Sequence, residues 1–455
     1  MTRTFRTARS FVLLFALAIS VASQDAPPGY ETIEFDGFVA TFDPNQEHVI
    51  LEGDLDCSRF GGASNVGVTE TSGRVGDADY VLFLPTEWNG DLVLFTHDYI
   101  PVEWAPAGRF WFPLPFGFAA ETSEMPFAVA RDIAVCQGFA WAASAYAGHG
   151  EAVAEGIRDT HLLLPTTRRH LDTAPAATFL MGYGLGGLVA VALAETYPHR
   201  YDGAVTLYGR IGGATLDQSR FGHVRVLFDV FFPDLIDPFT VDERAMTQPE
   251  LMAFHQALQA RIQADPSALQ RMASVHLPGS ELLDPAGVGL PLFAPNPRAP
   301  DAMAAFGSLA QGLMGAMTAW FIFIDDLRDR GDGLVFDNHQ TVYSGADWTA
   351  EDEAALNERV ARIEASQAAV RYWTTYYQPS GELRIPLLSL RPSWDYNGGI
   401  IHVWAYGQAV EGAGAQDSYT SWLIDDIGPR EAAEALRTLV EWAETGVRPP
   451  QPTVP

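Results

Sequence analysis

Short apolar runs alternate with stretches of helical periodicity along the first half of the chain. The runs are rich in β-branched and aromatic residues and read YVLFLPTEWNG, DLVLFTHDY, GFAWAASAY, AATFLMG and YDGAVTLYG. Apolar residues recur at helical spacing in EAVAEGIRDTHLLLPTTRRHL and LGGLVAVALAETYP. This alternation predicts parallel βαβ units with helices on both faces of a sheet. Asn89-Gly90, between the first two runs, predicts a hairpin turn.

The pattern changes near residue 216, where long helical stretches separated by Pro- and Gly-containing loops begin. LRIPLLSL then returns as a buried strand, SYTSWLI follows as the last strand, and PREAAEALRTLVEWAETG is the last helix. We therefore predict a signal peptide, a core in two parts, a helical cap inserted between them and a disordered tail. The signal peptide covers 1–23, the two parts of the core cover 24–215 and 381–445, the cap covers 216–380 and the tail covers 446–455.

The N-terminus has the layout of a secretory signal. Arginines at 3, 6 and 9 precede the apolar run 11–22, and small residues that suit cleavage follow. We expect a secreted or periplasmic protein with no membrane span in the mature chain, and an uncleaved anchor is the alternative. Export permits a disulfide between Cys57 and Cys136, although two buried free thiols fit the sequence equally well.

The net charge of the chain limits the kinds of partner that it can bind. The formal net charge is −29, and all 28 basic residues are arginine. Such an acidic surface repels nucleic acid, so we expect no nucleic-acid partner. The acidic loop 325–333 resembles a calcium loop in composition, but its spacing does not fit an EF-hand. We therefore expect no metal and no cofactor.

The segment FLMGYGLGGLVAVALAETYP carries the most informative motif. It resembles the nucleophile elbow G-x-S-x-G, in which a serine sits on a sharp turn from strand to helix. Together with FTHDY, FDNHQTVYSG and SGELRIPLLSLRPSWD, it makes residues 80 to 449 similar to the α/β-hydrolases, and to secreted bacterial esterase- or lipase-like members in particular. The resemblance implies a mostly parallel sheet flanked by helices with an inserted helical cap.

Three of the four catalytic elements that the resemblance identifies are altered, namely the nucleophile, the base and the oxyanion loop. Gly184 stands at the nucleophile position and offers no side chain that could attack a carbonyl. Asp395 matches the position of the acid. Ile427 or Gly428 stands where the family has its histidine base, and the last histidine of the chain is His402.

The oxyanion loop of the family normally reads His-Gly, whereas here His97 is followed by Asp98. A carboxylate would oppose a developing oxyanion if its side chain points inward. By the same resemblance, Tyr183, Leu185 and His149 are expected to contact a ligand.

These changes favour a pseudoenzyme that binds a small hydrophobic ester, acid or lipid, or a protein partner, without turning a substrate over. One alternative is an active ester or amide hydrolase with relocated residues, for which His97, His149 and Ser144 are the candidates. A further alternative is a structural protein in which the pocket has filled. Whether the chain is an enzyme stays open at this point.

Overall fold

The computed structural model describes residues 31–42, 48–60, 65–100, 127–276, 299–345, 347–393 and 399–450. The signal peptide predicted at 1–23, the last residues of the tail and Asp395 lie outside these ranges.

One mixed sheet forms the centre of the molecule. Its strands run in the order β1-β2-β4-β5-β7-β6-β8-β9-β10-β11, and β3 pairs with β4. The bounds are β1 Glu31–Phe35, β2 Phe38–Phe42, β3 His48–Leu55, β4 Val66–Val75, β5 Ala78–Pro85, β6 Leu92–Thr96, β7 Ala140–Ser144, β8 Thr178–Tyr183, β9 Gly203–Leu207, β10 Leu387–Pro392 and β11 Tyr419–Ile424.

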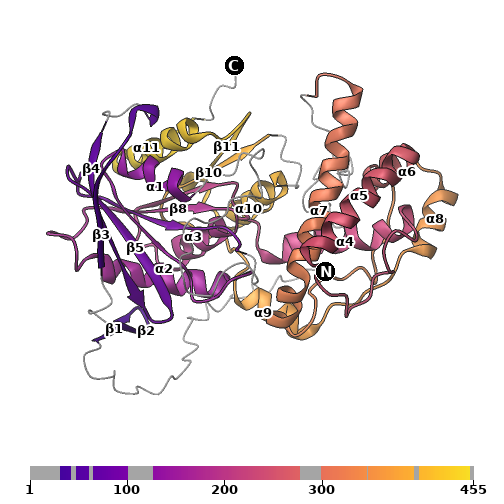
Figure 1. Cartoon of the computed structure of the whole chain (residues 1–455), viewed down its shortest axis with the longest axis horizontal. Coiled ribbons are helices and arrows are strands. Elements are labelled where there is room, and N and C mark those ends of the chain that lie inside the picture. Colours follow the sequence, from indigo (N-terminus) through magenta and orange to yellow (C-terminus); the bar gives the residue numbers. More distant parts are fainter. Residues whose placement is uncertain are drawn as a thin grey trace, which may run out of the picture.

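Helices cover both faces of this sheet, and a group of helices stands beside it on the right of Figure 1. The bounds are α1 Phe127–Val135, α2 Val153–Thr167, α3 Leu185–Thr196, α4 Ala214–Phe231, α5 Gln248–Ala264, α6 Pro266–Ala273, α7 Ala302–Gly331, α8 Ala350–Arg359, α9 Gln367–Thr375, α10 Ile400–Ala413 and α11 Pro429–Thr445. One face of the sheet buries its apolar side chains against α2, α3 and α10, and the other buries them against α1 and α11.

The predicted α/β-hydrolase-type fold is confirmed, with one qualification about the sheet. Pairing is parallel from β7 through β6, β8, β9 and β10 to β11. It is antiparallel from β1 to β7, so the sheet is mixed rather than mostly parallel. The first strands come from the polar leader. Their half-exposed faces lack the long apolar runs that identify buried strands.

The hairpin predicted at Asn89-Gly90 is wrong. The strands on either side of this turn, β5 and β6, do not pair with each other, because β7 lies between them. Strand β7 pairs antiparallel with β5 and parallel with β6. The turn therefore carries the chain across the width of one strand, and Gly90 supplies the positive φ of 99° that the turn needs.

A disulfide joins Cys57 to Cys136, with Cα atoms 5.4 Å apart, within the usual range for such a bond. It decides between the two alternatives left open by the sequence. It links the 3-10 turn η2 (Ser58–Phe60) to the end of α1. Because it joins residues 79 apart in sequence, loop-closure entropy predicts a stabilisation of about 4 kcal/mol.

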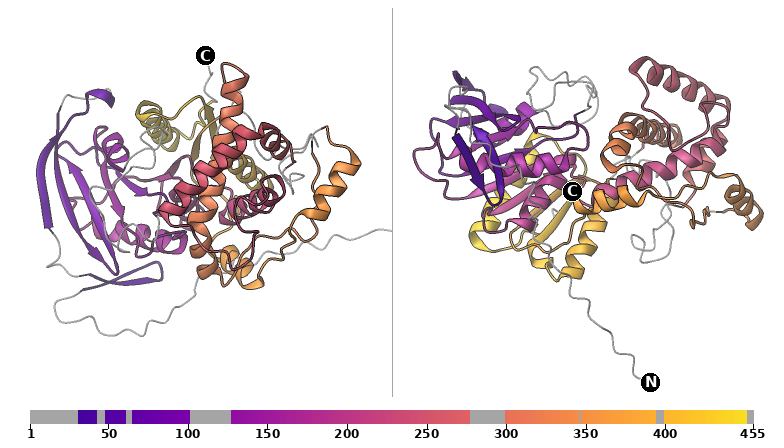
Figure 2. Two further views of the ribbon diagram at one scale, coloured as in Figure 1. Left: turned by 45° about the vertical axis from the view of Figure 1, so that its right-hand side comes forward. Right: turned by 90° about the horizontal axis from the view of Figure 1, so that it is seen from below.

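The helices α4 to α8 pack around an apolar centre of their own, apart from the two clusters that line the sheet. Helix α9 instead places Ala369 and Trp373 in the cluster on the α3 side of the sheet. Figure 2 shows this helical group beside the sheet from two further directions. The stretch 351–373, which has continuous helical periodicity, forms two helices because the chain turns away from helical conformation between Arg359 and Gln367.

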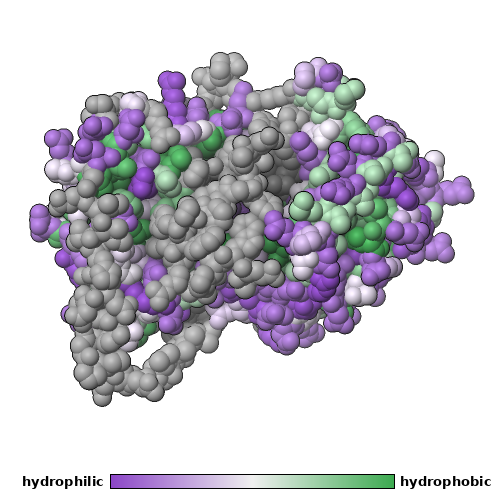
Figure 3. Space-filling model, in the orientation of Figure 1, coloured by the Kyte–Doolittle hydropathy of each residue, from purple (hydrophilic) through white to green (hydrophobic). Residues whose placement is uncertain are grey.

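Helix α7 is long and apolar enough to cross a membrane, by length and composition, with a mean hydropathy of 1.4 in its apolar window. The chain therefore contains one segment of spanning length after the N-terminus, which the expectation of no membrane span in the mature chain did not take into account. In the fold, 44% of that window is buried, and Trp320, Phe321 and Ile324 pack in the centre of the cap. Figure 3 shows mostly hydrophilic side chains on the described surface, with hydrophobic ones near the free end of α7, where Met303 is 83% exposed.

The return from the helical group to the sheet is fixed at one carboxylate. Glu195, near the end of α3, accepts hydrogen bonds from the backbone amides of Ser380 and Gly381 at 2.9 and 2.8 Å. The hydroxyls of Tyr377 and Tyr406 also donate to it. This anchor joins the last turns of the cap to the helix that begins at the predicted elbow.

Candidate functional site

The turn between β8 and α3 has the geometry of a nucleophile elbow. Gly184 links the two elements with φ 54° and ψ −117°. Its carbonyl accepts hydrogen bonds from the amides of Gly187 and Arg210, at 3.0 and 2.9 Å. Helix α3 approaches β6 so closely that a Cβ added to Gly186 would lie 1.9 Å from the carbonyl oxygen of Thr96. The sharp turn from strand to helix is the one that G-x-S-x-G sequences form.

The carboxylate of Asp98 fills the space above this turn. A Cβ added to Gly184 would lie 2.1 Å from Oδ1 of Asp98 and 2.2 Å from its Cγ. The backbone N–H of Leu185 donates to the same Oδ1 at 2.6 Å. In an active elbow, the N–H of the residue after the nucleophile binds the oxyanion. Asp98 therefore takes both the volume that a side chain at position 184 would need and the N–H of the residue that follows it.

Burial raises the pKa of Asp98, because an ionised carboxylate is costly away from water. The backbone amides of Leu185 and Tyr99 and the charge of Arg210 act in the opposite direction. The sequence predicted that Asp98 would oppose an oxyanion if its side chain points inward. In the structure it does point inward, onto the turn at Gly184.

His97 lies beside Asp98 but does not face the elbow. Its Nδ1 donates to the backbone carbonyl of Asp98 at 2.7 Å, since a carbonyl can only accept. The ring stacks on Tyr146 with centroids 3.8 Å apart. Burial lowers the pKa of His97 to about 4, so the imidazole is neutral at pH 7.

A histidine and an aspartate do pair near the elbow, although neither occupies a family catalytic position. Nε2 of His402, on α10, lies 2.9 Å from Oδ1 of Asp217, on α4. The amide of Gly212 donates to Nδ1 of the same ring at 3.1 Å. Because a carboxylate only accepts and an amide N–H only donates, His402 carries its proton on Nε2. Both ring nitrogens are engaged, so this imidazole has no lone pair left to act as a base.

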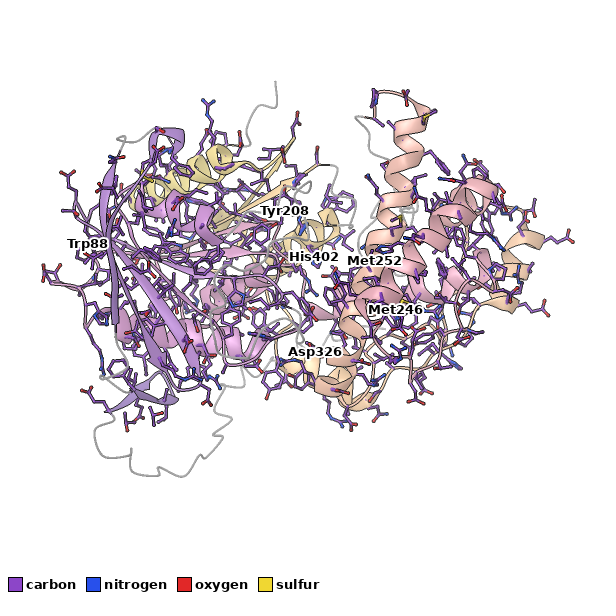
Figure 4. The ribbon with its side chains drawn as sticks, viewed as in Figure 1. Trp88, Tyr208, Met246, Met252, Asp326 and His402 are labelled. Atoms are coloured by element: carbon purple, nitrogen blue, oxygen red, sulfur yellow. A yellow bond between two sulfur atoms is a disulfide. The ribbon has the colours of Figure 1, made fainter. Side chains whose placement is uncertain are left out.

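Arg210 connects this pair to a second carboxylate. Its guanidinium bonds to Asp217 and, at 2.6 Å, to Oε1 of Glu151. Burial lowers the pKa of His402. Burial would raise the pKa of Asp217, but its interactions with His402 and Arg210 outweigh burial and hold that pKa well below its usual range. Figure 4 shows Tyr208 and His402 on the side of the sheet that faces the cap, and Asp326 on the cap helix α7.

The structure brings five of the predicted site residues together at the carboxyl ends of β6 and β8, namely His97, Asp98, Tyr183, Gly184 and Leu185. Non-glycine residues with positive φ follow the neighbouring strands, Tyr146 after β7 and Tyr208 after β9. Backbone strain of this kind gathers at functional sites.

The remaining predicted residues are placed as follows. His149 is buried, and its carbonyl accepts a hydrogen bond from Arg330 of α7. The hydroxyl of Ser144 accepts from the amide of Tyr146 at 3.1 Å. Where the family has its base, Ile427 is 2% exposed and packs in the apolar layer beneath α11, and Gly428 precedes that helix.

Sequence reasoning missed Arg210, Asp217 and Glu151. The position of Arg210 directly after a strand was the one local signal. Glu151 meets Arg210 across 59 residues of chain and Asp217 meets His402 across 185, so these two contacts have no local signal. Across the described ranges, no group of three or more His, Cys, Asp or Glu side chains could hold a metal ion.

Comparisons with known proteins give structural neighbours but no sequence relative. No family model and no curated protein matches the chain. Feruloyl esterase B from Aspergillus oryzae is 12% identical and aligns over 90% of this chain and 89% of its own, with a TM-score of 0.41. Tannin acyl hydrolase from Aspergillus niger is 12% identical, with coverages of 92% and 86% and a TM-score of 0.43. The cell wall degrading esterase LipA from Xanthomonas oryzae is 12% identical, with coverages of 87% and 97% and a TM-score of 0.36.

Proposed function

We propose that this chain is an exported, non-catalytic protein built on the scaffold of an ester hydrolase, and that it binds a small hydrophobic ligand or a protein partner. The observation that carries the proposal is the carboxylate of Asp98 on the elbow. It occupies the nucleophile volume over Gly184 and engages the amide of Leu185. An ester carbonyl at that place would meet a negative oxygen instead of a hydrogen-bond donor, which raises rather than lowers the barrier to acyl transfer.

The state of the histidines supports the same proposal. A general base needs a free lone pair within hydrogen-bond reach of the proton it removes. His402 uses both nitrogens. His97 directs its Nδ1 proton to a backbone carbonyl and keeps Nε2 without a hydrogen-bond partner among the described residues, but its ring is buried and stacked on Tyr146. The disulfide between Cys57 and Cys136 agrees with export, because such bonds persist in oxidising compartments.

The test is an esterase assay on the purified, oxidised protein. We expect no turnover of p-nitrophenyl acetate, butyrate or octanoate above the buffer rate, and no adduct with a fluorophosphonate probe by intact mass. A shift of the unfolding temperature with non-hydrolysed esters or fatty acids would show ligand binding.

The Ser144→Ala variant and the His97/His149 double variant are the controls. Turnover that either of them abolishes would refute the proposal and establish relocated catalysis, as would a probe adduct on Ser144. A protein that is inactive and also binds none of these ligands would favour the protein partner over the small molecule.

A further inference from the structure

Carboxylates outnumber cationic groups around Arg210. Glu151 and Asp217 bond directly to its guanidinium, and Asp98 lies close enough for its charge to act on Arg210. His402 adds no positive charge, because burial keeps its imidazole neutral. Three carboxylates thus face the guanidinium of Arg210 at the carboxyl edge of the sheet, beneath the cap, and Arg220 adds a second positive charge that acts on Asp217.

One oxygen of this cluster has no partner. Glu151 is 1% exposed and uses Oε1 for Arg210. Its second oxygen, Oε2, is buried and has no hydrogen-bond partner among the described residues. Burial raises the pKa of Glu151, and the charges of Asp217 and Asp326 raise it further. A buried carboxylate oxygen without a donor is costly, so the cluster has an unmet demand for positive charge.

The elbow has reversed its electrostatic preference. In a hydrolase, the N–H groups at this turn attract the oxygen of an ester. Here the half-buried Asp98 has taken the Leu185 N–H and presents a carboxyl group at the same place. The group that complements this position is a hydrogen-bond donor with positive charge, and an ester or carboxylate does not provide one.

Aromatic side chains surround the same edge of the sheet. Tyr183 and Tyr208 lie with ring centroids 5.7 Å apart at the ends of β8 and β9. Tyr99, next to Asp98, packs on Phe323 of α7 at 4.3 Å. Aromatic faces attract ammonium groups and also cover an apolar ligand body.

We propose that the site binds an amphipathic amine, with its ammonium group at Asp98 and its apolar body against Tyr99 and Phe323. Tyr183 and Tyr208 pack in the apolar layer beneath α1 and α11 and form the far wall of this edge. The inference rests on the proposed function, since it names the class of the ligand that the non-catalytic site would bind. It differs from the expectation of an ester, an acid or a neutral lipid.

The competing occupant is a proton. Asp98 and Glu151 could each relieve the charge excess by staying protonated, given the acids that face them, Asp217 and Asp326. A protonated cluster has no preference for a cation, so binding selectivity distinguishes the two occupants.

The experiment compares three ligands of nearly equal shape by isothermal titration at pH 7.5 and low salt. These are 2-phenylethylammonium, neutral 2-phenylethanol and anionic 3-phenylpropanoate. We expect the ammonium to bind at least about tenfold more tightly than the alcohol, and the carboxylate to bind weakest, with the preference reduced by 0.5 M salt. Equal binding of the three, tighter binding of the carboxylate, or no binding at all overturns the inference.

Asp98→Asn tests the residue itself. An asparagine oxygen can still accept from Leu185, so the turn keeps its hydrogen bond while the charge disappears. The variant should lose the preference for the ammonium over the alcohol. Asp329→Asn, which removes the same charge from an exposed position on α7, should keep it. The comparison of ligands on the unaltered chain does not depend on any variant folding.

The esterase assay separates this inference from the proposed function. Turnover would refute the proposed function whatever the ligand preference. An inactive protein that fails to discriminate between the three ligands would refute only the amine.

Discussion

Two neighbouring parts of this molecule each resemble half of a hydrolase site. The elbow at Gly184 has the backbone of such a site, with a left-handed φ of 54° at the turn and a helix N-terminus directly beyond it, but Gly184 has no side chain. The Asp217–His402 pair has the side chains of a catalytic dyad, but its imidazole is held at both nitrogens. Neither half can supply what the other lacks.

The difference shows that backbone geometry and chemistry are maintained by separate interactions. The elbow persists because α3, β6 and β9 pack closely around it and because glycine tolerates its dihedral angles. A histidine–aspartate hydrogen bond persists wherever it satisfies buried polar groups. Such a pair becomes catalytic only when the second nitrogen faces a nucleophile.

The largest expected effect comes from placing a serine at the elbow. Gly184→Ser should destabilise the fold by about 4 kcal/mol, because strain at positive φ adds to the collision of its Cβ with Asp98. Asp98→Gly in the same chain should recover about half of this loss. Neither variant should hydrolyse p-nitrophenyl esters, since no base faces the new hydroxyl.

Urea unfolding and the esterase assay check both parts of this prediction. Gly307→Ser, where the added Cβ meets no atom within 4 Å, is the matched control. Full stability of Gly184→Ser would mean that Asp98 moves away without cost, and turnover by the double variant would mean that a base lies within reach.

Removing the imidazole of the Asp217–His402 pair should change only the stability of the protein. His402→Leu removes a hydrogen bond from Asp217 and leaves the amide of Gly212 without its acceptor, at a cost of about 2 kcal/mol. Ligand binding and the absence of turnover should not change. The exposed His339→Leu is the control and should alter the unfolding free energy by less than about 0.5 kcal/mol. A loss of ligand binding at unchanged stability would place His402 in the site.

The contributions of Asp98 and His402 to the unfolding free energy should change with pH in opposite directions. The pKa of Asp98 is raised, so the folded protein holds that proton more tightly, and its contribution falls as pH rises above the ordinary value of 3.8. The pKa of His402 is lowered, so its contribution is present above 6.5 and is lost as pH falls below that value. A pKa that differs by one between the folded and unfolded chain changes the unfolding free energy by about 1.4 kcal/mol.

Unfolding free energies of the unaltered chain, Asp98→Asn and His402→Leu between pH 4 and pH 8 measure these slopes. As pH rises, the unfolding free energy of Asp98→Asn should increase relative to that of the unaltered chain. As pH falls, the unfolding free energy of His402→Leu should decrease less than that of the unaltered chain. The groups that face Asp98 are Arg210 and Asp217, and those that face His402 are Asp217, Arg391 and Arg210. Slopes of the same sign for both variants would contradict the assignment.

The elbow could be predicted from the sequence because its signal is local. Strand, glycine turn and small-residue helix are continuous in FLMGYGLGGLVAVALAETYP, and helical or alternating periodicity identified most of the other core elements. Asp98 could be identified as out of place from the residue type alone. Its distance from Gly184 could not, because it depends on how β6 and β8 pair across 86 residues of chain.

The Asp217–His402 pair could not be predicted either, because it depends on a contact between segments that lie even farther apart along the chain. Asp217 and His402 are 185 residues apart, and they meet only because the cap returns to the sheet between β9 and β10. The wrong hairpin at Asn89-Gly90 has a related origin. A turn signal fixes the local backbone, whereas pairing is decided by β7, which arrives about fifty residues later and buries both of its faces.

The smallest expected effect is spectroscopic, and it tests the dyad most directly. If Gly212 donates to Nδ1 of His402, the ¹⁵N shift of Nδ1 should be that of a bare nitrogen and Nε2 should carry the proton. The pattern should persist as pH falls through 6.5, the ordinary pKa of histidine, because burial lowers the pKa of His402. A catalytic imidazole donates from Nδ1 to its acid and keeps Nε2 free. A proton on Nδ1, or titration near pH 6.5, would therefore make His402 a candidate base, and the elbow would then lack its nucleophile and a free Leu185 N–H, but not a base.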